Sequence, residues 1–363
     1  MNTLGGLMMR RIAQHGPINV AHFMAEALNH PRHGYYANRD PLGVAGDYVT
    51  APEISQVFGE LIGLWCAVTW QTMGCPDPVI LVEPGPGRGT LMADALRATR
   101  SVPGFCDAVS LHLIETNQAL RSQQRSIVEN AGLARPAAWH DDLSGIPEGP
   151  VLLIANEFLD VLPVRQFQKT QDGWSERLVG LSQDGSNLRF VLSPPSERPA
   201  LLDESLNDAP TGSVAEVSPA ALSMAHTLGA RLKDRGGAAL FIDYGYWPSQ
   251  TGETLQAVRS HQYRGVLDAP GEADLTTHVD FAAFLRSGTQ TGARGFGPLE
   301  QGEFLQQLGL QARAQSLKAS ATPKQAAIID AGVTRLSDPN QMGTLFKAIV
   351  LQNSDLPNPP GFD

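Results

Sequence analysis

Cysteine is scarce in this sequence. The 363 residues include only three cysteines, Cys66, Cys75 and Cys106, and no two of them form a CxxC pair. Their scarcity and spacing exclude a disulfide framework of the kind that stabilises small secreted domains, and also a cysteine-based zinc site. We expect reduced, mostly packed thiols in a reducing compartment, and we predict no metal site.

Long apolar runs are also missing. No stretch reaches the roughly 18 apolar residues that a membrane-spanning helix needs, so no transmembrane segment is predicted. The first residues, MNTLGGLMMRRIAQHG, lack an apolar core followed by a small-residue cleavage site, and they are poor in serine. Neither a secretory signal nor a transit peptide is expected, and the predicted location is cytoplasmic.

Positively charged residues are also fewer than negatively charged ones. Lys and Arg total 27 against 37 Asp and Glu, which gives a formal net charge of −10. This balance argues against a general nucleic-acid binder, because affinity for a phosphate backbone comes from clustered Lys and Arg. A negative surface is compatible with a positively charged partner or substrate. The hydrophobic content of 42% is that of an ordinary soluble globular protein.

Apolar strands alternate with helices from Val79 onward, which is typical of βαβ units and a parallel sheet. The sequence therefore predicts an α/β fold of the Rossmann-like kind. Two segments interrupt the alternation, the first with period-two runs divided by Asp-Gly dipeptides, as in antiparallel hairpins. The predicted strands are 79–83, 108–115, 137–142, 151–157, 238–245 and 344–353, and the predicted helices between them are 90–100, 117–132 and 218–237.

The predicted domain organisation follows from this pattern. Residues 1–75 form an N-terminal helical region that contains a lid loop at 31–56. Residues 76–352 form the α/β domain, with inserts at 164–215 and 246–300. The Pro-rich residues 353–363 are expected to be a disordered tail.

The stretch VILVEPGPGRGTL, residues 79–91, carries a glycine-rich loop directly after the first strand of the α/β domain. The loop contains no Lys, which excludes a P-loop. Thr90 stands where a dinucleotide fingerprint needs its third glycine. Glu83 at the end of the strand would repel a pyrophosphate, but it suits a ligand with an ammonium group. The methionyl end of S-adenosylmethionine carries such a group, so Glu83, Gly85, Gly87, Gly89 and Thr90 are predicted to bind this cofactor.

Acidic residues also end the next two strands. Glu115 can accept the two hydroxyls of an adenosine ribose, and Asp141 or Asp142 can accept a proton of the adenine amino group. Taken singly, Glu115 could equally be a surface acid and Asp142 a helix N-cap. Their common position at the carboxyl edge of the sheet favours S-adenosylmethionine as the cofactor, because α/β sheets bind ligands at that edge.

Six segments are spread over most of the chain, and several of them are long and unusual in composition: 34–60, 82–91, 155–167, 216–219, 241–245 and 274–281. Together they resemble the MidA family of S-adenosylmethionine-dependent methyltransferases, whose mitochondrial members assist assembly of respiratory complex I. This resemblance implies a class I methyltransferase fold. It also implies symmetric dimethylation of an arginine on a core complex I subunit as the activity of the mitochondrial members. The sequence leaves open whether the chain forms a homodimer.

Methyl transfer to a guanidinium needs carboxylates that orient it and localise its charge. The loop after the fourth strand offers Asn156, Glu157 and Asp160, and Asn156 is also expected to contact the cofactor. Glu157 is the first choice for the acid that holds the guanidinium and Asp160 the second. The alternative is that Asp160 caps a turn while Glu157 anchors the loop. Tyr244 could line the same pocket or hydrogen-bond the substrate.

The lid loop is rich in polar and aromatic residues, which make poor material for a core. We expect it to cover cofactor and substrate, although a simple surface loop is the alternative. Three further residues are candidates for the substrate pocket; Glu216 could equally cap the helix that follows it, and His278 could be structural. The lid candidates are Tyr35, Tyr36, Tyr48, Thr50 and Glu53, and the other pocket candidates are Glu216, Asp243 and His278.

Two alternatives to a protein arginine methyltransferase stay open at this point. A small-molecule methyltransferase would need a sealed apolar cavity in place of an open acidic groove. A non-catalytic assembly factor would keep the fold without turnover, but the complete glycine loop and the strand-end acids argue against it.

Overall fold

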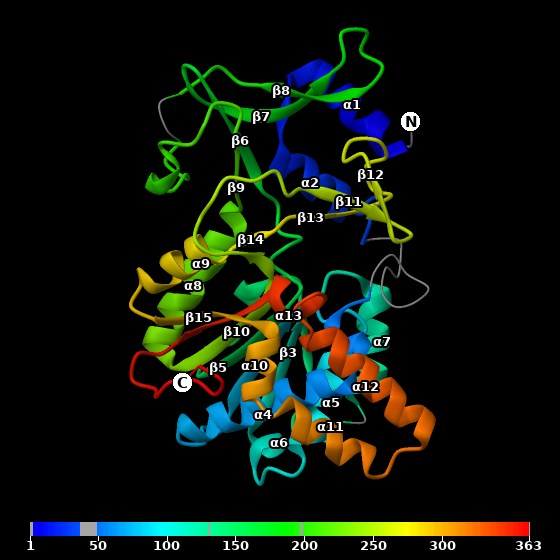
Figure 1. Cartoon of the computed structure of the whole chain (residues 1–363), viewed down its shortest axis with the longest axis vertical. Coiled ribbons are helices and arrows are strands. Elements are labelled where there is room, and N and C mark those ends of the chain that lie inside the picture. Colours follow the sequence, from blue (N-terminus) through cyan, green and yellow to red (C-terminus); the bar gives the residue numbers. More distant parts are fainter. Residues whose placement is uncertain (1–2, 37–48, 130, 197–198, 363) are drawn as a thin grey trace. The chain divides into compact units, whose positions relative to one another are not determined.

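A computed structural model describes residues 3–36, 49–129, 131–196 and 199–362 (Figure 1). The chain divides into two compact units, each assembled from three stretches. Unit 1 comprises Met1–Tyr48, Leu159–Met224 and Gly245–Phe284, and unit 2 comprises Val49–Phe158, Ala225–Tyr244 and Leu285–Asp363.

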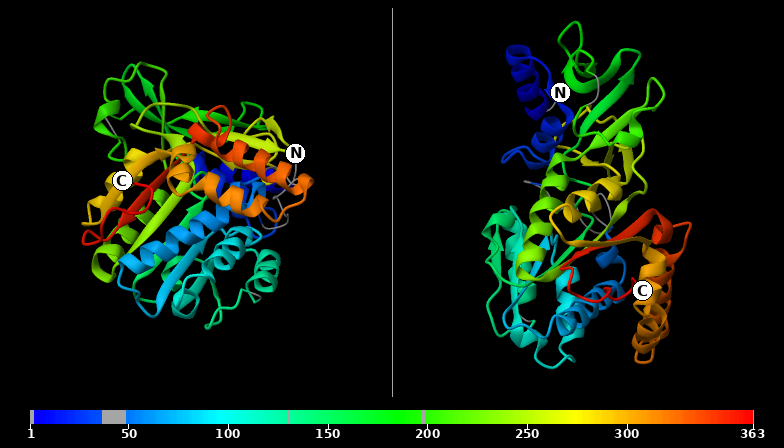
Figure 2. Two further views of the ribbon diagram at one scale, coloured as in Figure 1. Left: turned by 60° about the horizontal axis from the view of Figure 1, so that its bottom comes forward. Right: turned by 90° about the vertical axis from the view of Figure 1, so that its left-hand side faces the viewer.

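Unit 2 is built on a mixed sheet whose central strands are parallel, as predicted. The parallel strands β10, β5, β2, β3 and β4 are neighbours in that order. β16 and β15 extend the sheet in antiparallel fashion beyond β10. Figure 2 shows helices alongside these strands. The bounds are β15 (Arg294–Glu300), β16 (Phe346–Gln352), β10 (Gly237–Tyr246), β5 (Val151–Asn156), β2 (Val79–Pro84), β3 (Val109–Ile114) and β4 (Ala138–His140).

The helix α4 (Gln56–Thr72) packs closely on α5 (Thr90–Thr99), the helix that follows the glycine loop. Gly63 makes this approach possible, because a Cβ atom added there would lie 2.5 Å from the Cα atom of Ala95. The two helices and the inner strands share one hydrophobic core, in which Phe58, Trp65 and the β2 residues are buried. This core fixes the position of the loop between β2 and α5.

A buried carboxylate connects three helices of unit 2. Glu60 of α4 is fully buried; it pairs with Arg97 of α5 and accepts a hydrogen bond of 2.6 Å from Arg313 Nε. Arg313 lies on α11, which with α10 and α12 forms the group coloured orange in Figure 1. The other helices from α3 onward are α3 (Ala51–Ile54), α6 (Phe105–Ala108), α7 (Gln118–Val128), α8 (Pro219–Arg235), α9 (Phe281–Thr289), α10 (Gln301–Gln307), α11 (Leu310–Lys318), α12 (Pro323–Ser337) and α13 (Met342–Leu345).

Unit 1 contains antiparallel sheets and the first two helices. One sheet has the order β1-β7-β6-β9, with β8 also paired to β7, and the other has the order β12-β11-β13. The short strand β14 pairs with the last residues of β10. The bounds are α1 (Thr3–His15), β1 (Ile18–Asn19), α2 (Val20–Asn29), β6 (Arg165–Thr170), β7 (Gly173–Leu181), β8 (Leu188–Leu192), β9 (Val214–Val217), β11 (Gln256–Arg259), β12 (Gln262–Arg264), β13 (Asp274–Thr276) and β14 (Val279–Asp280).

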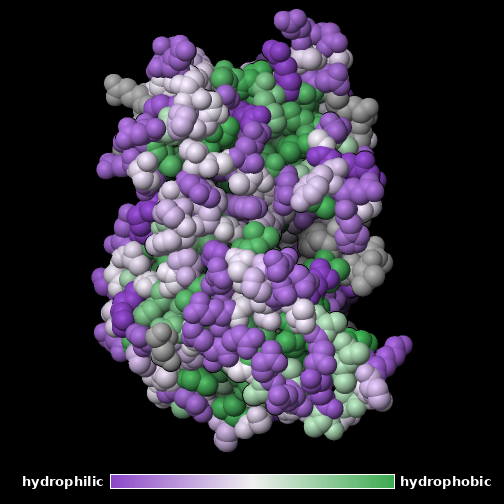
Figure 3. Space-filling view, viewed as in Figure 1, coloured by the Kyte–Doolittle hydropathy of each residue, from purple (hydrophilic) through white to green (hydrophobic). Residues whose placement is uncertain are grey.

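The structure differs from the sequence-based expectation at the C-terminal end. Residues 353–363 were expected to be a disordered tail, but Phe362 is buried against Phe304, and the Pro360 carbonyl accepts a hydrogen bond of 3.1 Å from Trp65 Nε1. The proline residues of this segment therefore accompany an anchored chain. The described residues contain no helix long and apolar enough to cross a membrane. On the face seen in Figure 3, hydrophobic residues lie interspersed among hydrophilic ones.

Candidate functional site

The carboxyl end of β2 places an acid in an apolar surrounding. Glu83 is only 4% exposed, and burial raises its pKa to about 8. Within the described ranges its Oε2 atom has no hydrogen-bond partner. Buried polar atoms in folded proteins are nearly always paired, so this oxygen is available to a ligand that carries a donor.

The loop after Glu83 has the backbone conformation that only glycine adopts without strain. Gly85, Gly87 and Gly89 have φ angles of 62°, 54° and 87°. At Gly85 a Cβ atom would also lie 3.0 Å from Cδ2 of Phe158. The loop thus keeps its main chain exposed to whatever occupies the end of β2, and Gly89 begins α5 as its N-cap.

Gln124 of α7 holds two of the predicted cofactor elements together. Its side chain is fully buried. The Nε2 atom donates to the Gly87 carbonyl at 2.6 Å and to Glu115 Oε2 at 3.4 Å, while Oε1 accepts from Trp139 Nε1 at 2.8 Å. Glu115 Oε1 accepts from the Asn117 amide at 2.7 Å. Burial raises the pKa of Glu115, and this hydrogen bond opposes the shift.

The two acids after β4 are both engaged. Asp141 is exposed and pairs with Arg121 at 2.5 Å. Asp142 Oδ1 accepts a hydrogen bond of 2.8 Å from the Ser144 amide, which makes it the N-cap of the turn at Leu143–Gly145. The Ser144 hydroxyl, and then this amide, hold the pKa of Asp142 below its ordinary value. The structure thus shows the capping role that the sequence had left as the alternative.

The end of β5, the strand beside β2, places Asn156 and Glu157 at the same edge of the sheet. Asn156 Oδ1 is buried and lacks a hydrogen-bond partner in the part of the chain that is described. Glu157 has a φ angle of 49°. Its Oε1 atom accepts from the Ala51 amide at 2.9 Å and from Asn156 Nδ2 at 3.1 Å. Glu157 therefore caps the short helix α3, and it lies beside Asn156, whose Oδ1 atom is the unpaired acceptor.

Of the two predicted lid residues that follow position 48, Glu53 contacts the glycine loop and Thr50 begins the helix that carries it. Thr50 is the N-cap residue of α3 without a capping hydrogen bond from its side chain. Glu53 accepts a short hydrogen bond from the Thr90 hydroxyl, and Arg88 Nη1 lies 3.9 Å from Glu53 Oε2. Residues 50–53 are thus tied to the loop after β2 and to the end of β5. Tyr48 and the rest of 37–48 lie outside the described residues.

Asp243 and Tyr244 follow the inner part of β10. Asp243 is 1% exposed; its Oδ2 atom accepts from the Phe158 amide at 3.1 Å, and Oδ1 accepts from the Tyr244 amide at 2.9 Å. It therefore orders the loop that carries Glu157. The Tyr244 ring packs edge-on against Phe346, with ring centroids 5.3 Å apart.

The predicted lid residues before position 37 belong to unit 1, and their surroundings differ from the expectation. Tyr35 is fully buried in the hydrophobic core formed with α1 and α2, although the segment seemed poor material for a core. Tyr36 packs edge-on against Tyr35 and donates to Asp274 Oδ1 at 2.8 Å. Because the Tyr36 hydroxyl has an acidic partner, Tyr36 can be part-buried beside the fully buried Tyr35 in this polar segment.

Three other candidates also lie in unit 1. Glu216 belongs to β9 and does not cap the next helix; it accepts from Gln166 Nε2 at 2.7 Å and from the Leu255 amide at 3.1 Å. Burial raises the pKa of Glu216, against these hydrogen bonds. His278 is part-buried, which lowers its pKa. Asp160 is 4% exposed, and its main-chain carbonyl accepts from the Thr277 amide at 2.9 Å.

The site in unit 2 can therefore hold a ligand that carries an ammonium group near Glu83 and hydroxyl groups near Glu115. Glu83 Oε2 and Asn156 Oδ1 are the open buried acceptors, and they end neighbouring strands. Glu115 directly follows β3, the next strand outward. Among the described residues there is no group of His, Cys, Asp and Glu that could hold a metal ion. The residues present fit S-adenosylmethionine, because an ammonium group would satisfy Glu83.

Sequence reasoning missed Gln124. A signal for it exists, since the spacing of Leu120, Gln124 and Val128 places a glutamine on the apolar face of α7, and all three are buried. A polar residue at such a position needs partners. Phe158, which packs against the glycine loop, and the amide of Ala51 carry no comparable signal, because their roles depend on contacts between distant segments.

Comparisons with known proteins agree with this geometry. The profile of a family described as S-adenosyl-L-methionine-dependent methyltransferases matches residues 61–299. A mouse protein named protein arginine methyltransferase NDUFAF7, mitochondrial, is 40% identical over 95% of this chain and 83% of its own length. The human protein of the same name is 39% identical over 95% of this chain and 82% of its own.

A solved structure from Burkholderia thailandensis, bound to S-adenosyl-homocysteine, is also similar. It matches 99% of this chain and 92% of its own with 30% sequence identity and a TM-score of 0.83. The predicted fold class is therefore confirmed. The predicted cytoplasmic location is contradicted, because the mouse and human relatives are named as mitochondrial proteins.

Proposed function

The chain belongs to the family of S-adenosyl-L-methionine-dependent methyltransferases, and from this premise we propose that it methylates arginine side chains of a protein. The predicted family, enzyme class and cofactor are confirmed. The observation that carries the choice of arginine is the 40% identity, over 95% of the chain, to a protein arginine methyltransferase.

S-adenosylmethionine, when bound, supplies a methyl group on a sulfonium centre. We propose that Glu83 accepts hydrogen bonds from its ammonium group, since the Oε2 atom is buried and open. The main chain of Gly85, Gly87 and Gly89 would lie against the methionyl part, and Thr90 would fix the start of α5 through Glu53. This arrangement explains why the loop has neither a lysine nor a phosphate-binding pattern.

The adenosine end is assigned to the next strands. Glu115 would accept the ribose hydroxyls, with its carboxylate oriented by Gln124 and the Asn117 amide. The adenine amino group is assigned to Asp141 or Asp142. Asp142 keeps a carboxylate oxygen besides the one that caps Ser144, whereas Asp141 would have to rearrange its ion pair with Arg121.

The acceptor end is assigned to Asn156 and Glu157. A protonated guanidinium is a poor nucleophile, and a carboxylate that pairs with one side of it localises its charge and orients the reacting nitrogen. Transfer of the methyl group leaves the guanidinium with one proton fewer, and that proton must reach an acceptor or solvent. Glu157 is the acid that we place beside the guanidinium, and Tyr244 is assigned to the wall of the same site. Asp160 is the second candidate acid.

The acceptor protein is assigned from the resemblance to the MidA family. We propose a core subunit of respiratory complex I, with symmetric dimethylation of an arginine. The two alternatives, a small-molecule methyltransferase and a non-catalytic assembly factor, receive no support from the names of the relatives, which specify protein arginine methylation.

The proposal is tested by adding the protein and radiolabelled S-adenosylmethionine to lysate from cells that lack the protein. We expect a labelled protein band whose acid hydrolysate contains labelled symmetric dimethylarginine. Label in small molecules alone would favour the first alternative. Cofactor binding without any labelled product would favour the second.

Glu157→Gln separates binding from transfer. Glutamine keeps an oxygen that can accept from the Ala51 amide, so α3 stays capped, but it removes the charge next to the guanidinium. We expect a loss of transfer of about 100-fold or more, with cofactor affinity within about twofold of the wild type. Glu157→Ala, which also removes the cap, is the matched comparison. An equal loss of cofactor affinity in the Gln variant would assign Glu157 to the cofactor site.

A further inference from the structure

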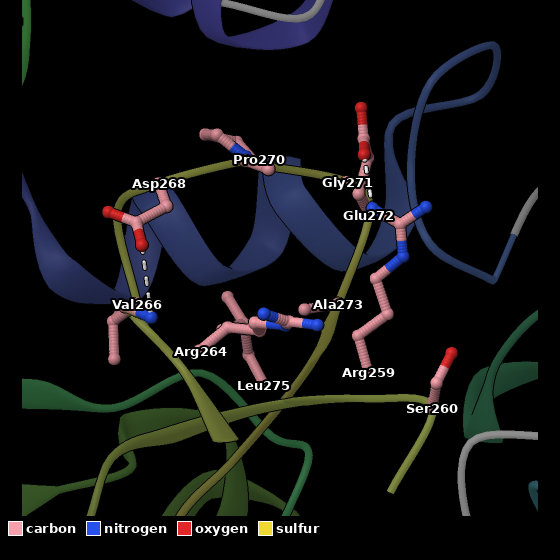
Figure 4. Close-up of a pocket in the computed structure, with 12 residues that line it drawn as sticks. Arg259, Ser260, Arg264, Val266, Asp268, Pro270, Gly271, Glu272, Ala273 and Leu275 are labelled. Carbon is pink, nitrogen blue, oxygen red and sulfur yellow. Dashed lines mark hydrogen bonds and ion pairs between the residues drawn. The ribbon is translucent and has the colours of Figure 1, made fainter. Parts of the chain in front are cut away.

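A small pocket in unit 1 lies between the hairpin of β11 and β12 and the loop that leads into β13 (Figure 4). The hairpin turns at Ser260 and His261, whose φ angles are 51° and 58°. These angles are typical of the tight two-residue turn that joins antiparallel strands. The pocket is thus walled by a short hairpin and a returning loop of the same unit.

The loop that closes the pocket is held in place. The Asp268 amide donates to the Gly265 carbonyl at 3.0 Å, and Asp268 Oδ2 accepts from the Gly265 amide at 3.2 Å. Gly271 packs so close to the preceding chain that a Cβ atom would lie 2.1 Å from the His33 carbonyl oxygen. Leu275, which is 2% exposed, provides an apolar floor. The pocket is therefore preformed by main-chain contacts.

The charges of the pocket are unevenly matched. Arg259 Nη1 pairs with Glu272 at 2.5 Å. The Asp268 carboxylate accepts its hydrogen bond from the Gly265 amide at one end of the loop. Figure 4 shows the Arg264 guanidinium directed toward the middle of the pocket. The hydrogen-bond partner of Arg264 is the neutral Gln262 Oε1 at 3.1 Å, and no acid of the described chain pairs with it. The guanidinium of Arg264, an exposed residue, thus faces a partly enclosed space.

We propose that this pocket binds a carboxylate on a short aliphatic stem. A guanidinium presents paired donors that match the two oxygens of a carboxylate, and it keeps its charge at every physiological pH. Val266, Ala273 and Leu275 offer apolar surface for the methylene groups. The same chemistry is found in an Asp or Glu side chain of a bound protein and in a free dicarboxylic acid. The inference does not depend on which side chain is methylated.

The test is isothermal titration calorimetry on the full chain with acetyl-Gly-Glu-Gly-amide, the matching Gln peptide, and glutarate. We expect the Glu peptide to bind at least about tenfold more tightly than the Gln peptide. Arg264→Gln should remove this difference, and Arg264→Lys should retain part of it, because it keeps the charge but not the fork. Arg10→Gln, at an exposed arginine of the same unit, should change nothing.

Each outcome decides the proposal. Binding of glutarate without the Glu peptide supports the carboxylate site and assigns it to a free acid. Equal binding of the Glu and Gln peptides with no binding of glutarate overturns it, as does unchanged binding in Arg264→Gln. Circular dichroism of both arginine variants checks that they are folded.

Discussion

Gln124 offers a direct test of how the cofactor site is organised. Replacing it with Leu removes three hydrogen bonds, to the Gly87 carbonyl, to Glu115 and from Trp139, inside a fully buried position. The Gly87 carbonyl and the Trp139 indole would lose these partners, at a cost of roughly 1–3 kcal/mol each. Glu115 would lose an orienting donor, and weakening the charge-assisted bond that we propose between Glu115 and the ribose corresponds to about a tenfold loss of cofactor affinity.

The assay is calorimetric titration of S-adenosylmethionine and of its 2′-deoxyribose analogue. The wild type should bind the natural cofactor more tightly than the analogue if Glu115 accepts the ribose hydroxyls, as we propose. Gln124→Leu should lose most of this preference, whereas the control Gln123→Leu, at an exposed site on the same helix, should retain it. A folded Gln124→Leu variant with the wild-type preference would refute the positioning role and leave Gln124 as a packing residue.

Two further predictions concern the end of β2. Because the pKa of Glu83 is raised from 4.5 to about 8, the folded protein without cofactor binds more protons than the unfolded chain in that range, so its melting temperature should fall as the pH rises through it. An ammonium ligand favours the ionised acid, so cofactor affinity should rise toward pH 8, by at most about tenfold per pH unit. Glu83→Gln should abolish both pH trends. A wild type whose melting temperature and cofactor affinity do not change with pH would contradict the prediction. Gly85→Ala should lower the free energy of unfolding by about 1–2 kcal/mol because of its left-handed backbone conformation alone. The contact with Phe158 should add to this loss, and urea unfolding measures the total. The control Gly185→Ala, at an open turn with φ of 70°, should show only the loss that comes from the backbone conformation.

The elements of the parallel sheet were predictable because their signals are local. The predicted strand at 79–83 corresponds to β2 and the one at 151–157 to β5, since fully buried parallel strands are nearly continuous apolar runs. The placement of Glu83, Glu115 and Asn156 at one edge follows directly from parallel pairing. The antiparallel pairing of β6 with β7, inside the first insert, also follows from its period-two pattern.

The elements that escaped prediction depend on distant partners. β15 lies inside the segment interpreted as the second insert, and it is a strand because it pairs with β16. Its sequence, RGFGPLE, contains two glycines and a proline and carries no strand pattern. The helix α11, which packs against α12, is anchored where Arg313 contacts the buried Glu60 of α4. The two residues of this charge pair are 253 positions apart, so no local pattern in the sequence predicts their contact.

The short helix α3 connects the two functional ends of the site. Its first amide is capped by Glu157, the acid proposed to hold the guanidinium. Its Glu53 contacts Thr90 and Arg88, which flank the last glycine of the cofactor loop. A rearrangement of either end would therefore alter a contact of α3. Because Glu157 caps α3, only a substitution that keeps this cap, such as Gln, can distinguish the proposed chemistry of Glu157 from its support of α3.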